Sequence, residues 1–102
     1  MDQNKQPRGK ALLASAEGKV CIKCGRGNGE VCARHYNGQR QHQYGKGRGI
    51  KCHPLATAEL CHNCDSVFSE GVKSGMSDDE RSEEWLHWIM MTNIRRFDSG
   101  EL

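Results

Sequence analysis

Two copies of the motif Cys-x-x-Cys stand in this chain, one at Cys21 and Cys24 and the other at Cys61 and Cys64. Thiolates are soft ligands that zinc prefers, and a gap of two residues lets one turn present two of them to the same ion. Because a structural zinc site takes four ligands, the two motifs together predict one such site. A disulfide or a redox role is the alternative use of these cysteines. The 36 residues between the motifs are more than a simple zinc ribbon has, so further structure is expected between the two halves of the site.

A second set of side chains suits chemistry on a phosphodiester. His35 ends an expected strand between the two motifs, and histidine is the side chain that best exchanges a proton with water near neutral pH. Asp65 follows the last cysteine, and its carboxylate is a hard ligand suited to Mg²⁺ or Mn²⁺, with His53 as a further candidate ligand. The plain alternatives are that His35 only forms a hydrogen bond within a hairpin and that Asp65 only faces water.

The sequence does not decide whether three further residues bind the metal. His62 lies between two of the predicted ligands and can take the place of one of them. Cys32 and Cys52 either enter the zinc shell or serve as small buried hydrophobic residues.

The composition predicts a single small domain that needs such a metal. Of its 102 residues 35% are hydrophobic and 27% are charged, and 12 are glycine, which loses more backbone entropy on folding than other residues. Bound zinc then supplies stability that a small core lacks. The residues from Met1 to Gln6 have no apolar core of a signal peptide, and no apolar run reaches transmembrane length. We therefore expect a cytoplasmic protein without a membrane partner, where disulfides are rare and clustered cysteines bind metal.

The charge is unevenly distributed along the chain. From Lys5 to Lys51 there are eleven basic residues against two acidic ones, whereas from Cys52 onward ten acidic residues stand against four basic ones. A basic half predicts contact with nucleic acid, although charged faces are often simply solvated. The candidate phosphate contacts lie around and within a Gly-rich loop: Arg34, Arg40, Lys46, Arg48 and Lys51.

The elements that must position these residues follow from local patterns. Residues 1–18 are expected to form a flexible basic arm with a short helix near 10–16, residues 19–70 a zinc-bound core, and residues 76–98 an amphipathic helix that packs on it. Within the core we expect strands at 19–25 and 30–36, a hairpin turn at Asn37-Gly38 and a helix over 57–68. Residues 71–75 read as a linker. Ser77 and Glu80 match a capping box for the last helix, whose stripe of Trp85, Trp88, Ile89 and Thr92 is expected to be core.

The order of these motifs resembles an HNH nuclease domain, also called a His-Me finger or ββα-metal domain, and in particular the small phage and prophage nucleases related to HNH enzymes. The resemblance covers about residues 19–97 and depends on the two Cys-x-x-Cys motifs and on the segments 34–38, 45–54 and 57–64. The tail over residues 82–96 is also similar. It implies a ββα-metal core with an added C-terminal helix, His35 as general base, and structural zinc on the four cysteines. Two departures weaken the implied catalysis: the family usually has a histidine where Asp65 stands and an asparagine where Ala56 stands.

The leading prediction is therefore a small α+β, zinc-stapled, metal-dependent DNA endonuclease of phage origin, with structural Zn²⁺ and catalytic Mg²⁺ or Mn²⁺. The alternative is a non-catalytic zinc module that binds nucleic acid in phage recombination or replication. A zinc-stapled adaptor that binds proteins through its acidic helix is a third.

Overall fold

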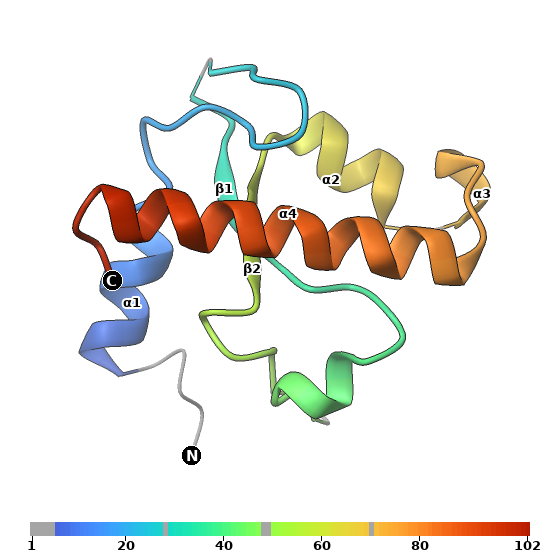
Figure 1. The fold of residues 1–102 in the computed structure, drawn as a ribbon, viewed down its shortest axis with the longest axis horizontal. Helices are drawn as coiled ribbons and strands as arrows, with labels where there is room; N and C mark the ends of the chain where they lie inside the picture. The colour runs from blue at the N-terminus through green and yellow to red at the C-terminus, as the bar shows by residue number, and fades with distance from the viewer. Residues whose placement is uncertain (1–5, 28, 48–49, 70) are drawn as a thin grey trace.

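The computed structural model describes residues 6–27, 29–47, 50–69 and 71–102, which form a small compact α+β domain (Figure 1). Two antiparallel strands pack against one long C-terminal helix, with shorter helices at the periphery. The elements in chain order are α1 (Pro7–Ala14), β1 (Cys32–His35), the 3-10 helix η2 (Gln41–Tyr44), β2 (Thr57–Leu60), α2 (His62–Phe68), α3 (Gly71–Ser74) and α4 (Asp78–Asp98).

The two strands pair without a tight turn between them. Cys32 lies opposite Leu60 and His35 opposite Thr57, so residues 36–56 form a long connection at one end of the pair. The predicted hairpin turn at Asn37-Gly38 is therefore wrong. Both residues instead lie in the long connection, where they contact neighbouring side chains and backbone. The Asn37 side chain donates to the carbonyl oxygen of Ser69 at 2.9 Å, and a Cβ atom at Gly38 would lie 2.3 Å from the hydroxyl oxygen of Tyr36.

The predicted helix over 57–68 is divided between a strand and a helix. All four residues of β2 are buried, because the strand pairs with β1 on one side and lies under α4. The helix α2 begins only after Cys61, whose extended backbone (φ −73°, ψ 164°) makes it the N-cap in place of Thr57. The strand-to-helix change therefore falls on a predicted zinc ligand.

The remaining short segments differ from expectation in detail. The helix α1 starts at Pro7 rather than near residue 10, and Pro suits the first turn of a helix because its missing N–H has no partner there. Residues 19–25 form a turn and not a strand, although the amide of Ile22 donates to the carbonyl oxygen of Glu59 at 2.8 Å. The expected linker at 71–75 contains the short helix α3.

The C-terminal helix confirms its prediction closely. The hydroxyl oxygen of Ser77 accepts the amide of Glu80 at 3.1 Å, and the Glu80 carboxylate accepts the amide of Ser77 at 3.2 Å. The stripe of Trp85, Trp88, Ile89 and Thr92 is buried against β2 and α2, as expected of a core face. No helix in the described ranges is long and apolar enough to cross a lipid bilayer.

Candidate metal centre and the cavity beside His35

The four cysteines of the two motifs meet at one point. The sulfur atoms of Cys21, Cys24, Cys61 and Cys64 all lie within 4.8 Å of one another, and those of Cys24 and Cys61 are 3.7 Å apart. A zinc ion with Zn–S bonds of about 2.3 Å holds its tetrahedral sulfurs about 3.8 Å apart. The donor set and its spacing therefore fit zinc, and the four thiols are free of disulfides.

The local backbone around each motif holds its pair of cysteines in position, by a hydrogen-bonded turn in one motif and by a helix N-terminus in the other. The turn at Cys21 is closed by its amide donating to the carbonyl oxygen of Arg26 at 2.8 Å and by the amide of Gly25 donating back to Cys21 at 2.9 Å. Gly25 has a φ of 79°, in the left-handed region that favours glycine. On the other side Cys61 caps α2 and Cys64 lies in its first turn, with the Cys64 amide 3.5 Å from the Cys61 sulfur.

The electrostatics of the cluster favour replacing protons by a cation. Burial acts to raise the pKa of the Cys21 thiol, but backbone hydrogen bonds at Cys24, Cys61 and Lys23 outweigh it and lower the pKa to about 7. Burial, reinforced by the neighbouring sulfurs, raises the pKa of Cys64 well above its ordinary value. Several thiolates cannot share this space without a positive ion, and zinc supplies one.

The three uncertain residues lie outside the cluster. Cys32 is exposed on β1, and His62 is exposed at the start of α2. Cys52 is buried, its thiol approaches the carbonyl oxygens of Tyr36 and Gln41 at 3.6 and 3.5 Å, and burial raises its pKa. Within the part of the chain that the structure describes, no second group of three or more Cys, His, Asp or Glu side chains is placed to hold a metal.

His35 lines a cavity of its own. It is the last residue of β1, at the point where the long connection begins. The cavity has a volume of about 320 Å³ and is lined by His35, Tyr36, Asn37, Gln41, Lys46, Lys51 and Cys52. We refer to it as the His35 cavity. Both lysines are exposed residues of the connection, so this cavity combines an imidazole with two ammonium groups.

The predicted cation ligands do not join His35. Adjacent residues of a strand point to opposite faces, and Arg34, the neighbour of His35, reaches Asp65 on α2 with an N–O distance of 3.8 Å. His53 accepts a hydrogen bond from the amide of Leu55 at 3.1 Å through its Nδ1 atom. Neither Asp65 nor His53 lines the His35 cavity.

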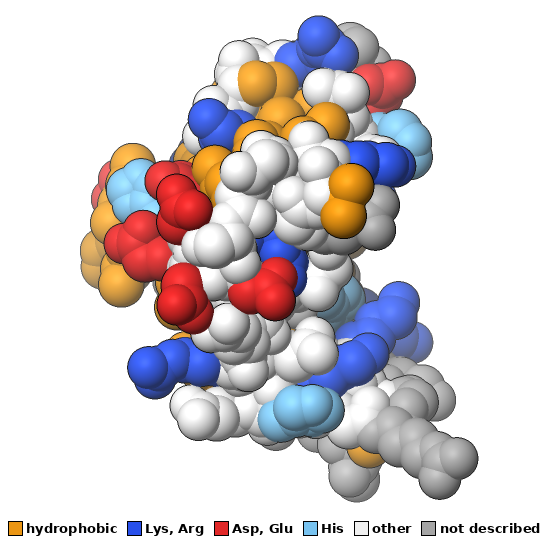
Figure 2. All heavy atoms as spheres, turned by 90° about the vertical axis from the view of Figure 1, so that its right-hand side faces the viewer, with side chains coloured by type: hydrophobic (Ala, Val, Ile, Leu, Met, Phe, Trp, Pro, Cys, Tyr) orange, Lys and Arg blue, Asp and Glu red, His pale blue; other side chains and the backbone are white. Residues whose placement is uncertain are grey.

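The predicted phosphate contacts are only partly gathered. Lys46 and Lys51 border the His35 cavity, Arg40 is exposed nearby in the chain, and Arg34 is half-buried beside Asp65. Arg48 lies outside the described residues. Figure 2 shows most acidic side chains of that face at the left and centre, whereas Lys and Arg side chains are spread from the top of the face to its lower left and lower right. The first turn of α4 contains three acidic residues, Asp78, Asp79 and Glu80.

Sequence reasoning gave no role to the polar and aromatic lining of this region. Gln41 and Asn37 line the His35 cavity, and Tyr36 and Tyr44 meet edge to face with ring centroids 5.4 Å apart. A connection without helical or strand periodicity carries no pattern that would place these side chains.

No family model, curated protein or solved structure matches this chain. The resemblance to HNH nucleases stays a prediction from motifs, while the four-cysteine cluster and the His35 cavity are features of the molecule itself.

Proposed function

We propose that this chain is a zinc-stabilised DNA endonuclease whose reaction takes place at the His35 cavity. The observation that carries the proposal is the meeting of His35 with Lys46 and Lys51 around one cavity. The order of strand, long connection, strand and helix, with a histidine ending the first strand, adds support because the HNH resemblance implies the same order.

The proposed division of labour follows from the side chains. The ammonium groups of Lys46 and Lys51 neutralise a phosphate, as Lys and Arg side chains do in protein–DNA complexes. His35 accepts a proton from a water molecule while the water oxygen attacks phosphorus. The phosphorus bond to the leaving oxygen then breaks, and that oxygen takes a proton from solvent. Zinc has a structural part only, since all four of its ligand positions are taken by cysteine.

The structure gives little support to the predicted binding of Mg²⁺ or Mn²⁺ by Asp65. Asp65 already faces the guanidinium of Arg34, so its carboxylate is compensated without a metal. Apart from the four cysteines, the described residues contain no group of three or more His, Cys, Asp or Glu side chains close enough to hold one ion together.

A non-catalytic zinc module that binds nucleic acid is the second candidate. The ion pair between Arg34 and Asp65 favours it, because it engages the carboxylate that the endonuclease prediction assigns to a divalent cation.

Nicking of supercoiled plasmid by the purified zinc-loaded protein tests the two candidates. Assays with Mg²⁺, with Mn²⁺ and with neither should show cutting that His35→Ala lowers by about 10²–10⁴, the usual effect of losing a general base. Zinc content should be unchanged in this variant, because His35 lies outside the four-cysteine cluster, and DNA affinity should change little, because the proposed phosphate contacts are those of Lys46 and Lys51.

His87→Ala is the matched control, since His87 is exposed on α4. If the parent protein binds DNA but never cuts it under any of these conditions, the endonuclease proposal is wrong and the binding module takes its place. If cutting requires Mg²⁺ and Asp65→Ala raises the concentration needed, the cation displaces Arg34 from Asp65.

A further inference from the structure

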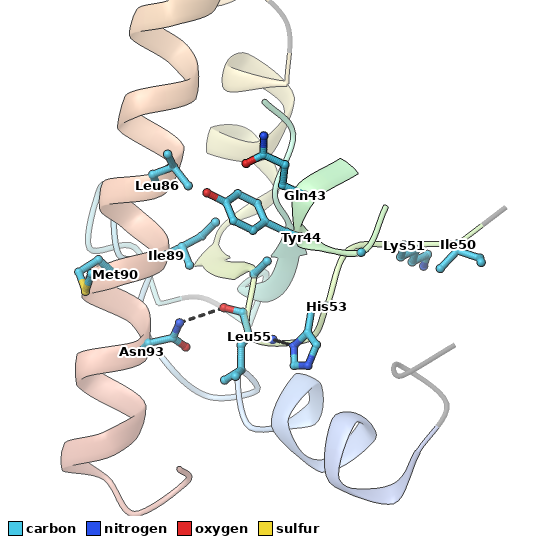
Figure 3. Close-up of a pocket in the computed structure, with 12 residues that line it drawn as sticks. Gln43, Tyr44, Ile50, Lys51, His53, Leu55, Leu86, Ile89, Met90 and Asn93 are labelled. Atoms are coloured by element: carbon cyan, nitrogen blue, oxygen red, sulfur yellow. Dashed lines mark hydrogen bonds between the residues drawn. The ribbon is translucent and has the colours of Figure 1, made fainter. Parts of the chain in front are cut away.

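A second, larger hollow runs between α4 and the long connection (Figure 3). Its volume of about 700 Å³ falls within the range of about 300–1,000 Å³ typical of small-molecule sites. Most of its wall is apolar, with Leu86, Ile89 and Met90 from α4 and Tyr44, Ile50, Leu55 and Ala56 from the connection. We refer to it as the α4 groove.

The α4 groove and the His35 cavity share a wall. Lys51 lines both, so a phosphate at Lys51 would lie at the border between them. Figure 3 shows Tyr44, Leu86 and Ile89 around the middle of the groove, with Lys51 on the side of the connection opposite α4. Because one cation belongs to both hollows, a single ligand that carries a phosphate and an apolar ring can occupy them together.

The wall of the groove on the connection side is braced. The amide of His53 donates to the carbonyl oxygen of Tyr44 at 2.7 Å, and the Asn93 side chain donates to the carbonyl oxygen of Leu55 at 2.9 Å. The Nδ1 atom of His53 accepts the Leu55 amide, which leaves the ring proton of neutral His53 on Nε2 as a donor. Gln43 adds an amide to the lining.

We propose that the α4 groove binds one unpaired nucleobase of a DNA strand whose phosphates lie at Lys46 and Lys51. A base has a flat apolar face for Tyr44 and the aliphatic wall, and a polar edge for Gln43 and His53. Its own phosphate then reaches Lys51 at the border. The inference rests on the proposed function and deepens it, because the substrate becomes single-stranded or locally unpaired DNA rather than an intact duplex.

Three short DNA probes labelled with a fluorophore test this by anisotropy: a single strand, a duplex, and a backbone-only oligomer of equal length in which every base is missing. The single strand should bind at least about fivefold more tightly than the backbone-only oligomer, since one base on an aromatic and apolar platform contributes that much. The neutral double variant Leu55→Gln, Met90→Gln should bring these two affinities within about twofold of each other. Both residues are exposed enough to change without unfolding, at 41% and 61%.

The matched control is Met91→Gln, Ile94→Gln, two exposed apolar residues of α4 that do not line the groove. This variant should keep the preference of the parent protein. A second variant pair, Lys46→Ala, Lys51→Ala, should weaken binding of all three probes and reduce the dependence of affinity on salt.

The outcomes distinguish the nucleobase site in the α4 groove from the proposed binding of nucleic acid itself. Equal affinity of the parent for the single strand and the backbone-only oligomer, with binding that still needs the lysines, overturns the base site and leaves nucleic-acid binding standing. Absence of binding to every probe overturns both. If ultracentrifugation shows a dimer that Leu55→Gln, Met90→Gln converts to a monomer without changing DNA affinity, a second copy of the chain covers the groove and the base site is wrong.

Discussion

A single buried carboxylate does much to hold the zinc-binding turn in place. Glu59 on β2 is fully buried, and its side chain accepts hydrogen bonds from Arg95 at 2.8 and 3.2 Å with Lys19 3.5 Å away. Arg95 also donates to the carbonyl oxygen of Val20, next to the first zinc ligand. The acidic residue thus links β2, α4 and the segment that enters the metal site.

Replacing this carboxylate by its neutral isostere should destabilise the fold. Glu59→Gln leaves Arg95 without its anion, whereas Lys19 keeps its ion pair with Glu101, and losing one partner of a buried ion pair costs about 3–5 kcal/mol. Because both cations retain some exposure, we expect the lower end of that range. Urea unfolding of the zinc-loaded protein measures the effect, and Glu83→Gln on the exposed side of α4 is the control. Equal midpoints for Glu59→Gln and the parent would show that the pair contributes nothing.

At the scale of elements, the sequence predicted what local rules determine. The capping box and the tryptophan stripe predicted α4, and the alternation near residue 32 predicted β1. The Cys-x-x-Cys spacing predicted the metal cluster, because one turn of this length presents both of its thiolates to the same ion.

The predictions of secondary structure fail where contacts between residues distant in the sequence determine the structure. Residues 57–60 contain Thr57 and Glu59, which look like the polar start of a helix, yet they form a buried strand because β1 and α4 enclose them. Arg96, fully buried, donates to the hydroxyl oxygen of Thr57 at 2.7 Å, and the Thr92 hydroxyl accepts the amide of Glu59 at 3.1 Å. No window of the sequence shows that partners 33 to 39 residues away satisfy these groups. The ion pair that engages Asp65 was missed for the same reason.

The N-terminus of α4 offers a test of local determination. Ser77→Ala removes the acceptor of the Glu80 amide, and such a cap is worth about 0.5–2 kcal/mol. The melting temperature should therefore fall by a few degrees, about 4–8 °C per kcal/mol for a domain of this size. Ser99→Ala at the other end of the same helix should change it little. An unchanged melting temperature for Ser77→Ala would mean that packing of Trp85 and Trp88, and not the cap, determines where the helix begins.

At the scale of the whole molecule, the four cysteines bring together two parts of the chain that are distant in the sequence. One pair belongs to the turn after α1, and the other belongs to the start of α2 beside the central strand. The apolar core is small and centres on Trp85, Trp88, Leu60 and the cysteines themselves. A metal at that position therefore acts as part of the core, and folding should depend on it.

Removing zinc should unfold the domain in a way that depends on pH. Zinc bound to cysteine ligands contributes roughly 10–16 kcal/mol of apparent free energy in small domains, which is as large as the whole free energy of unfolding of an ordinary domain, about 5–15 kcal/mol. Metal binding needs thiolates, and the pKa of Cys21 is lowered to about 7 while that of Cys64 is raised. Protons therefore compete with zinc more strongly as pH falls, so the stability that zinc supplies is greater at pH 8 than at pH 6. Fluorescence of the buried Trp85 and Trp88, followed during titration with a chelator in a reducing buffer, should show unfolding at lower chelator concentration at pH 6 than at pH 8.

Cys61→Ser should be unfolded at either pH, whereas Cys32→Ser, altered outside the cluster, should behave as the parent protein does. Retention of the buried tryptophan signal after complete removal of zinc would mean that β2 and α4 hold the fold without the metal.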